Sequence, residues 1–280
     1  MANVLNVIRK EGLLRDSKGF TSGQLVEYHG LSFFVTNEAT ANRAIYAVTK
    51  EPDTVKWIEH FGSGCTFWDV GANVGVFSLY AAHKRAARVL AFEPVFSNYF
   101  ILNRSIAANK LEASVRAYGI AVGDKTGFVD MVLSSLGEGA ALHGCGEGTE
   151  GSYRQPVACF TIDDLVAKFA FAPPTHIKID VDGYEASVIA GARKVLTNRA
   201  VKTLMVELAT GTEVEVRDAI TEAGFVLAGK FHRLEQSPYR NHLFVRPNDQ
   251  SFWRQRVYDA LEGAAKEISS LPNEGHDSSR

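Results

Sequence analysis

The stretch 66-TFWDVGANVGVFSLY-80 decides the fold of this 280-residue chain. It begins with a short apolar run that carries an acid, Asp69, and continues into a glycine loop and a helical pattern. Eighteen residues past Gly75, Glu93 follows a second strand-like run over residues 88–92. Strand, glycine turn, helix, strand and acid, in that order, are typical of a βαβ unit that binds a nucleotide.

The loop reads GANVG and not G-x-G-x-x-G, which bears on the ligand. Gly71 allows a tight turn, and Gly75 lets backbone and ligand approach closely, because neither carries a Cβ. Asp69 lies two residues before the loop, where it would repel a pyrophosphate and attract an ammonium group. Glu93 could accept hydrogen bonds from both hydroxyls of a ribose. S-adenosylmethionine therefore fits better than a dinucleotide, although a glycine loop alone could be an ordinary strand-to-helix turn.

Composition narrows the class of protein. The hydrophobic fraction of 46% is enough for a substantial core, and the net charge of −2 gives no electrostatic footprint for nucleic acid. No apolar run reaches the roughly 18 residues of a membrane span, and the N-terminus lacks the pattern of a signal peptide. Cys65, Cys145 and Cys159 are an odd set without metal-like spacing, which indicates reduced thiols. We expect a cytoplasmic protein.

Residues 1–64 are predicted to form an N-terminal appendage. The pattern over residues 24–35 indicates two short strands around a His29-Gly30 turn. A helix is expected over residues 41–61, which Pro52 can break and Asp53 can cap.

Residues 65–250 are predicted to form the core, and residues 251–280 a helix and a disordered tail. Core strands are expected at 66–70, 88–92, 114–118, 128–133, 175–179 and 201–208, and helices at 74–84, 96–109, from 185 to about 197, and at 213–223. Runs at 225–229 and 243–245 indicate an antiparallel edge hairpin. This alternation predicts an α/β fold with a mostly parallel sheet and helices on both faces.

Residues 134–153 are rich in glycine and poor in bulky apolar side chains, which predicts a surface loop. The loop could be a plain connector or a lid over the substrate. His143 within it is a candidate base, although a lone histidine in a loop is more often an ordinary surface residue.

Several motifs together resemble the FkbM family of S-adenosylmethionine-dependent methyltransferases. They are DVGANVG at 69–75, FEP at 92–94, AVGD at 121–124, KIDVDGYE at 178–185, AGA at 190–192 and VEL at 206–208. The resemblance extends from about residue 65 to residue 247. It implies a Rossmann-like class I methyltransferase fold, whose seven-stranded sheet has an antiparallel last strand. It also implies methyl transfer from S-adenosyl-L-methionine, usually to a hydroxyl of a sugar or polyketide-like acceptor.

The resemblance also assigns residues to the parts of the donor. Four residues are placed around the methionine part: Asp69, Gly71, Asn73 and Gly75. Glu93 is placed on the ribose, and Ala121 to Asp124 beside the adenine. Asp180 is placed at the carboxyl end of the fourth strand, facing donor and acceptor. The family often has Glu where this chain has Asp182, so a direct contact of that shorter side chain with a ligand is in doubt.

A neutral hydroxyl is a poor nucleophile and needs a base or a cation beside it. Asp180 and Glu207 follow neighbouring strands at the edge where open α/β sheets bind ligands. Lys178 lies two residues before Asp180 and therefore points to the same face. We expect these three side chains to converge as the catalytic group.

Each catalytic candidate has a structural alternative. Asp180 could cap the following helix, Glu207 could be a solvated strand end, and Lys178 could extend to solvent from an edge strand. The two carboxylates could also hold Mg²⁺, but the family resemblance requires no metal.

The leading hypothesis is O-methylation of a hydroxyl on a sugar, glycan or natural-product acceptor. The alternatives are N-methylation, RNA 2′-O-methylation, and a non-catalytic module that only binds S-adenosylmethionine. Intact Asp69, Gly71, Glu93 and Asp180 argue against lost chemistry, and the GANVG loop argues against a nicotinamide dehydrogenase. Acceptor identity and oligomeric state are not specified by the sequence.

Overall fold

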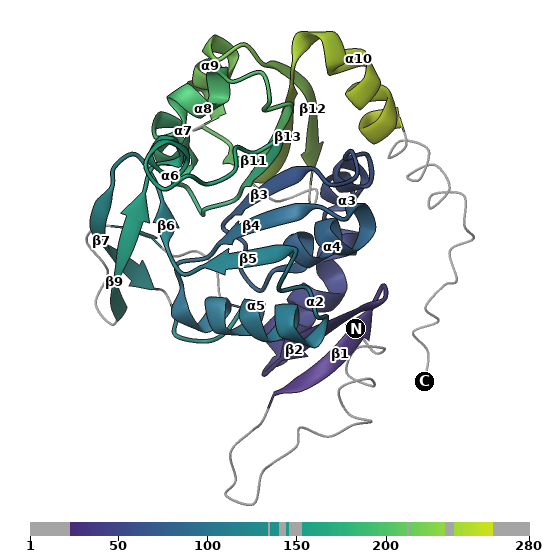
Figure 1. Ribbon diagram of the computed structural model, residues 1–280, viewed down its shortest axis with the longest axis vertical. Helices are drawn as coiled ribbons and strands as arrows, with labels where there is room; N and C mark the ends of the chain where they lie inside the picture. Colours follow the sequence, from purple (N-terminus) through teal and green to yellow (C-terminus); the bar gives the residue numbers. More distant parts are fainter. Residues whose placement is uncertain are drawn as a thin grey trace, which may run out of the picture.

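Strand β3 (Thr66–Val70) shows how the fold is layered, because all five of its residues are buried. Phe67 packs into one apolar cluster, while Trp68 and Val70 pack into another. Side chains alternate across a strand, so β3 must be covered on both faces. The computed structural model describes residues 23–133, 135–139, 144–145, 153–211, 213–232 and 238–259, and it has this three-layer arrangement (Figure 1).

The central sheet has seven strands. In spatial order they are β12 (Val226–His232), β13 (Tyr239–Val245), β11 (Thr203–Ala209), β10 (His176–Ile179), β3, β4 (Arg88–Phe92) and β5 (Val115–Tyr118). All pair in parallel except β13, which is antiparallel to both β11 and β12. The predicted seven-stranded Rossmann-like sheet and its antiparallel last strand are confirmed.

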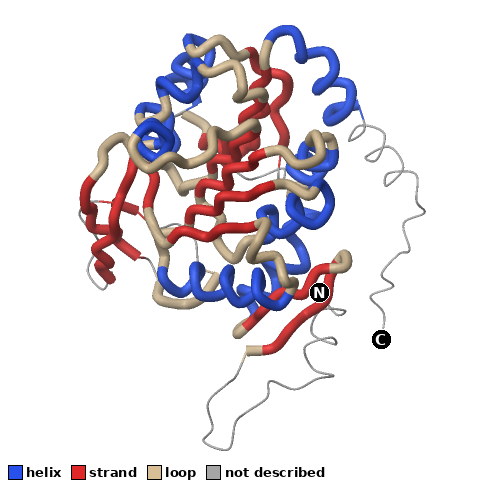
Figure 2. Tube along the Cα trace, viewed as in Figure 1, coloured by secondary structure: helices blue, strands red, loops and turns tan. Residues whose placement is uncertain are grey.

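Helices cover both faces of this sheet (Figure 2). One face is covered by α2 (Glu38–Lys50), α3 (Pro52–Glu59), α4 (Val76–Arg85) and α5 (Phe96–Ala108), and the other by α6 (Ile162–Ala167), α7 (Glu185–Ala190), α8 (Arg193–Thr197) and α9 (Glu213–Glu222). The chain crosses from one side of β3 to the other between β5 and β10. This reversal is the switch point at which open α/β sheets bind ligands.

The N-terminal segment packs directly on the sheet. Its hairpin, β1 (Gln24–Tyr28) with β2 (Leu31–Val35), turns at His29-Gly30 as predicted. The predicted helix is broken at Pro52, which is the first residue of α3. Asp53 does not cap α3, so that prediction was wrong. The cap position is Glu51, and the Asp53 side chain instead accepts a hydrogen bond from Asn241.

A second, four-stranded sheet lies beside α5. It comprises β6 (Ala121–Val122), β9 (Tyr153–Phe160), β7 (Gly127–Leu133) and β8 (Gly144–Cys145). Strand β9 was not predicted from the sequence. Most of the predicted loop at 134–153, including His143, lies outside the described residues.

The predicted single helix ending near Thr197 is two helices, α7 and α8, with a break at Gly191. A Cβ on Gly191 would lie 2.0 Å from the Gly123 carbonyl oxygen, so the backbones touch there. The Asp163 carboxylate then accepts from the amides of Lys194 and Val195 at 3.0 and 2.8 Å, which starts α8 anew.

After β13 the chain forms η1 (Pro247–Asp249), α10 (Gln250–Trp253) and η2 (Arg254–Asp259). Trp253 and Val257 from this segment join the apolar cluster on the α3 face. The predicted disordered tail lies outside the described residues. Within the described part of the chain, no helix is both long and apolar enough to cross a membrane.

Candidate active site

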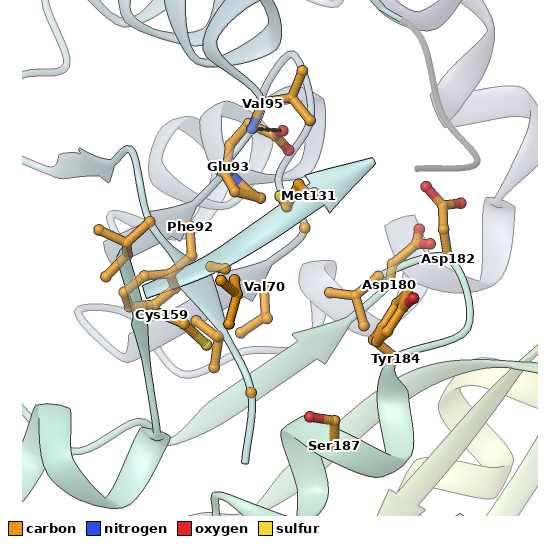
Figure 3. A pocket seen from close by; sticks show the side chains of 18 of the residues that line it. Val70, Phe92, Glu93, Val95, Met131, Cys159, Asp180, Asp182, Tyr184 and Ser187 are labelled. Carbon is orange, nitrogen blue, oxygen red and sulfur yellow. Dashed lines mark hydrogen bonds between the residues drawn. The ribbon is translucent and has the colours of Figure 1, made fainter. Parts of the chain in front are cut away.

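A cavity of about 390 Å³ opens at the carboxyl ends of β3, β4 and β10. Its walls come from the turns after these three strands and from the second sheet. Figure 3 shows Asp180, Asp182 and Tyr184 together on one side, with Glu93 on another. The volume lies in the range of small-molecule sites.

The glycine loop joins the three strand ends. Gly71 has φ +84°, and a Cβ there would lie 1.8 Å from the Asp180 carbonyl oxygen. The Gly71 and Ala72 amides both donate to the Phe92 carbonyl oxygen at 3.0 Å. Any side chain at position 71 would therefore force β3 and β10 apart.

Gly75 was predicted to let the backbone approach the ligand closely, but in the structure its missing side chain makes room for a neighbouring helix. It has φ +88°, and a Cβ there would lie 2.2 Å from Leu102 Cδ1 on α5. Gly75 does not line the cavity. The missing side chain lets α4 pack against α5.

Glu93 lines the cavity although it is only 4% exposed. The Asn73 and Val95 amides donate to its Oε2 and Oε1 at 2.8 and 2.9 Å, and Asn98 adds a side-chain hydrogen bond. Burial raises the pKa of this carboxyl to about 7, with a further contribution from the charge of Asp182 and against the lowering effect of its hydrogen bonds. A carboxylate held this way keeps lone pairs for ribose hydroxyls.

Asp180 also lines the cavity. Its Oδ2 accepts a hydrogen bond from Lys178 Nζ at 2.7 Å. It does not cap α7, whose cap position is Tyr184 without a side-chain cap bond. Lys178 lies on a central strand and is 2% exposed, so it does not extend to solvent from a sheet edge.

Asp69 and Glu207 lie behind the cavity wall and do not line it. Asp69 is paired in register with Lys178, and its Oδ2 accepts from Ser78 Oγ at 2.6 Å. Burial raises the pKa of Asp69, while Lys178 and Ser78 act against that rise. Glu207 is 5% exposed, so it is not a solvated strand end. Both are on the α3 side of the sheet, with Lys178.

The remaining wall suits a flat, largely apolar group. Ala121 and Asp124, which the resemblance assigns to the adenine, line this wall, and the Asp124 amide donates to Ser187 Oγ at 3.1 Å. Met131 and Cys159 from the second sheet complete this wall.

Some residues of the site were not predicted from the sequence, or were predicted only with doubt. Asp182, doubted because of its short side chain, lines the cavity at φ +51°. Glu185 anchors that loop, since its Oε1 accepts from the amides of Val181 and Gly183 at 3.2 and 3.1 Å. An Asp-Gly pair is a turn signal that could have directed attention to this loop.

The same residues can be compared with the parts of the predicted donor. An apolar wall, Glu93 facing the cavity and two acids opposite it match the adenine, ribose and ammonium parts of S-adenosylmethionine. In the described part of the chain, no group of three or more His, Cys, Asp or Glu side chains is arranged to hold a metal ion.

Comparison with known proteins identifies the family. The model of the methyltransferase FkbM domain matches residues 69–227, which is more than half of the chain. This chain belongs to the FkbM methyltransferase family. It is a methyltransferase with a Rossmann-like fold, and its methyl donor is S-adenosylmethionine, as the resemblance predicted.

Two curated relatives are methyltransferases. Hexuronic acid methyltransferase AglP of Haloferax volcanii is 24% identical over 228 residues, covering 78% of this chain and 90% of that protein. Methyltransferase sdnD of Sordaria araneosa is 36% identical over 97 residues, covering 34% of this chain and 36% of that protein. Similar solved structures include TYW2 of P. horikoshii in complex with MeSAdo, at 11% identity, a TM-score of 0.46, and coverage of 81% of this chain and 71% of that one.

Proposed function

We propose that this FkbM methyltransferase methylates a hydroxyl oxygen of a sugar or glycan acceptor, with Asp180 as the general base. The observation that carries the proposal is the Asp180 carboxylate on the cavity wall, held by Lys178 at 2.7 Å. S-adenosylmethionine, when bound, supplies a methyl group activated by the sulfonium to which it is attached.

The residues of the chain would divide the remaining work. Glu93 and the wall around Ala121 would hold the adenosine, and Gly71 and Asn73 would shape the bed of the methionine part. Asp180 would accept the hydroxyl proton as the acceptor oxygen bonds to the methyl carbon and the bond from that carbon to the donor sulfur breaks. The products would be a methyl ether and S-adenosylhomocysteine. Asp182, beside Asp180 on the same loop, would contribute negative charge that suits the donor ammonium.

The sugar class of acceptor is supported by one relative. AglP, 24% identical over most of both chains, is named for methylation of hexuronic acid. Asp180 on the cavity wall is also a hydrogen-bond acceptor for a hydroxyl of such a substrate. The odd set of three cysteines without metal-like spacing supports action in a reducing compartment, the cytoplasm.

Calorimetry with S-adenosylmethionine, S-adenosylhomocysteine and NAD tests the donor site first. Glu93→Ala should weaken binding of S-adenosylhomocysteine by about 1–3 kcal/mol, the scale of a lost charged hydrogen bond. Unchanged affinity in this variant, or tighter binding of NAD, would contradict the assigned donor site. Glu59→Gln, on α3 away from the cavity, is the control.

A screen of hexuronic acids, neutral sugars and amines, read by mass spectrometry, then tests the acceptor. Asp180→Asn should lower turnover with the best hydroxyl acceptor by roughly 10²–10⁴, while S-adenosylhomocysteine still binds. Asp218→Asn, on the surface of α9, is the matched control. Near-normal turnover of Asp180→Asn would place the base elsewhere, and transfer only to amines would overturn O-methylation.

A further inference from the structure

We propose that Glu51, contributed by the N-terminal segment, is a positioning residue that sets the basicity of Asp180 through Lys178. The inference rests on the role proposed above for Asp180. Glu51 does not line the cavity, so it would act without touching donor or acceptor.

Lys178 stands between two carboxylates. Its Nζ lies 2.7 Å from Asp180 Oδ2 on the cavity side and 4.0 Å from Glu51 Oε2 on the α3 side. The side chains of Lys178 and Glu51 are 3% and 9% exposed, whereas that of Asp180 is 20% exposed. The Phe77 ring, 5.1 Å from Nζ, covers the ammonium from α4. Water therefore screens this set of charges poorly.

Glu51 is fixed in place by its own partners. Its Oε2 accepts from Thr54 Oγ1 at 3.0 Å and from Asn241 Nδ2 at 3.1 Å. Asn241 also donates to Asp53 Oδ2 at 2.8 Å, which ties β13 to the start of α3. The carboxylate at the N-terminus of α3 is thus built into the fold.

This geometry gives Lys178 a second counter-charge. If Asp180 takes a proton from an acceptor, the buried ammonium loses its nearest anion, which would be costly without another carboxylate nearby. Glu51 at 4.0 Å supplies that carboxylate. Without Glu51, one negative charge that repels the Asp180 carboxylate and shares the Lys178 ammonium would be gone, although Asp69 would remain beside Lys178. Asp180 would then be held more firmly in the ionised form and would be a weaker base.

Other titratable groups face this pair from each packed element. Among the described residues they are Asp69 on β3, Asp53 on α3, Glu207 on β11, Glu185 on α7, and Asp182 and Glu93 around the cavity. His176, two residues before Lys178 on β10, is kept neutral because burial lowers its pKa to about 3. Replacing Glu51 alone keeps all of these side chains, but it also removes a charge that helps to raise the pKa of Asp69.

The experiment measures the pKa of the Asp180 carboxyl directly. Protein labelled with ¹³C at aspartate carboxyls is titrated by NMR with S-adenosylhomocysteine bound, and the Asp180 signal is assigned by its loss in Asp180→Asn. Glu51→Gln keeps the shape of the side chain and should lower the pKa of Asp180 by about half a unit to one unit. Lys178→Met should raise it by about 1–3 units. Glu59→Gln, at the other end of α3, should leave it unchanged.

Opposite shifts from Glu51→Gln and Lys178→Met are expected, since mere loosening of the fold would not move one group in two directions. If the pKa of Asp180 in Glu51→Gln equals that in the wild-type protein, while Lys178→Met shifts it, the proposed role of Glu51 is wrong. If Glu51→Gln does not fold, Glu51→Asp replaces it and should give a smaller shift of the same sign. The titration needs no acceptor, so failure of the acceptor screen would count against the proposed function only.

Discussion

At the scale of single residues, Glu93 makes donor binding depend on pH. Its pKa is raised to about 7 by burial, so the carboxyl is mostly protonated at pH 6 and mostly ionised at pH 8. A ribose diol is best accepted by the ionised form. Affinity for S-adenosylhomocysteine should therefore rise about tenfold per pH unit below pH 7 and level off above it, with a proton released on binding at pH 6. Calorimetry in buffers of different ionisation enthalpy measures both quantities.

Glu93→Gln should flatten this pH dependence, because an amide does not titrate. The same raised pKa also affects the free protein. Between the ordinary pKa of 4.5 and about 7, the folded state holds a proton that the unfolded state releases. This contribution to stability is present below pH 4.5 and is lost as the pH rises through 7. An affinity that does not change between pH 6 and pH 8 would contradict the raised pKa.

Residue types and order were enough to place Gly71, Glu93 and Asp180 at the strand ends that line the cavity, since each follows a strand of the parallel sheet. The residue types and their order did not show which side chains reach the cavity and which lie behind its wall. Asp69 lies behind the wall because its strand position faces α4. The missing side chain of Gly75 makes room for the Leu102 side chain. Alternation gives the face of a strand to which a side chain points. What fills the space beyond that face depends on elements far away in sequence.

At the scale of elements, the loop after β10 depends on Glu185. This buried carboxylate accepts from two loop amides, and the loop carries Asp182 and Tyr184 into the cavity. Glu185→Ala should release the loop and weaken S-adenosylhomocysteine binding roughly tenfold or more, since each lost hydrogen bond to a charged group is worth about 1.5–3 kcal/mol. Glu185→Gln keeps an oxygen acceptor and should lose less. Equal affinity in all three proteins would show that the loop holds itself.

Element boundaries were predicted best where buried runs are short and apolar, as in β3 and β4. The strand β9 was not predicted because Pro156 interrupts its strand-like sequence pattern. Among the described residues, β6 pairs with β9 only at Cys159 and Phe160, so Pro156 is flanked by β7 alone and its missing N–H does little harm. The break between α7 and α8 also depends on a distant partner, the Gly123 carbonyl.

At the scale of the whole molecule, the N-terminal segment is part of the core on which the sheet rests. Trp57, Ile58 and Phe61 are each 0% exposed and belong to the same apolar cluster as Phe67, and Trp57 Nε1 donates to Thr203 Oγ1 on β11 at 2.8 Å. Burial of each such side chain is worth roughly 1.5–3 kcal/mol, against a net stability of about 5–15 kcal/mol for a typical domain.

A chain lacking residues 1–64 should therefore fail to unfold cooperatively in urea, and should not bind S-adenosylhomocysteine. Trp57→Ala should lower the free energy of unfolding by about 3–5 kcal/mol, while Phe128→Ala, at a position 84% exposed, should change it little. A truncated chain that unfolds in one sharp transition and binds the ligand normally would instead show that residues 1–64 are a separable appendage.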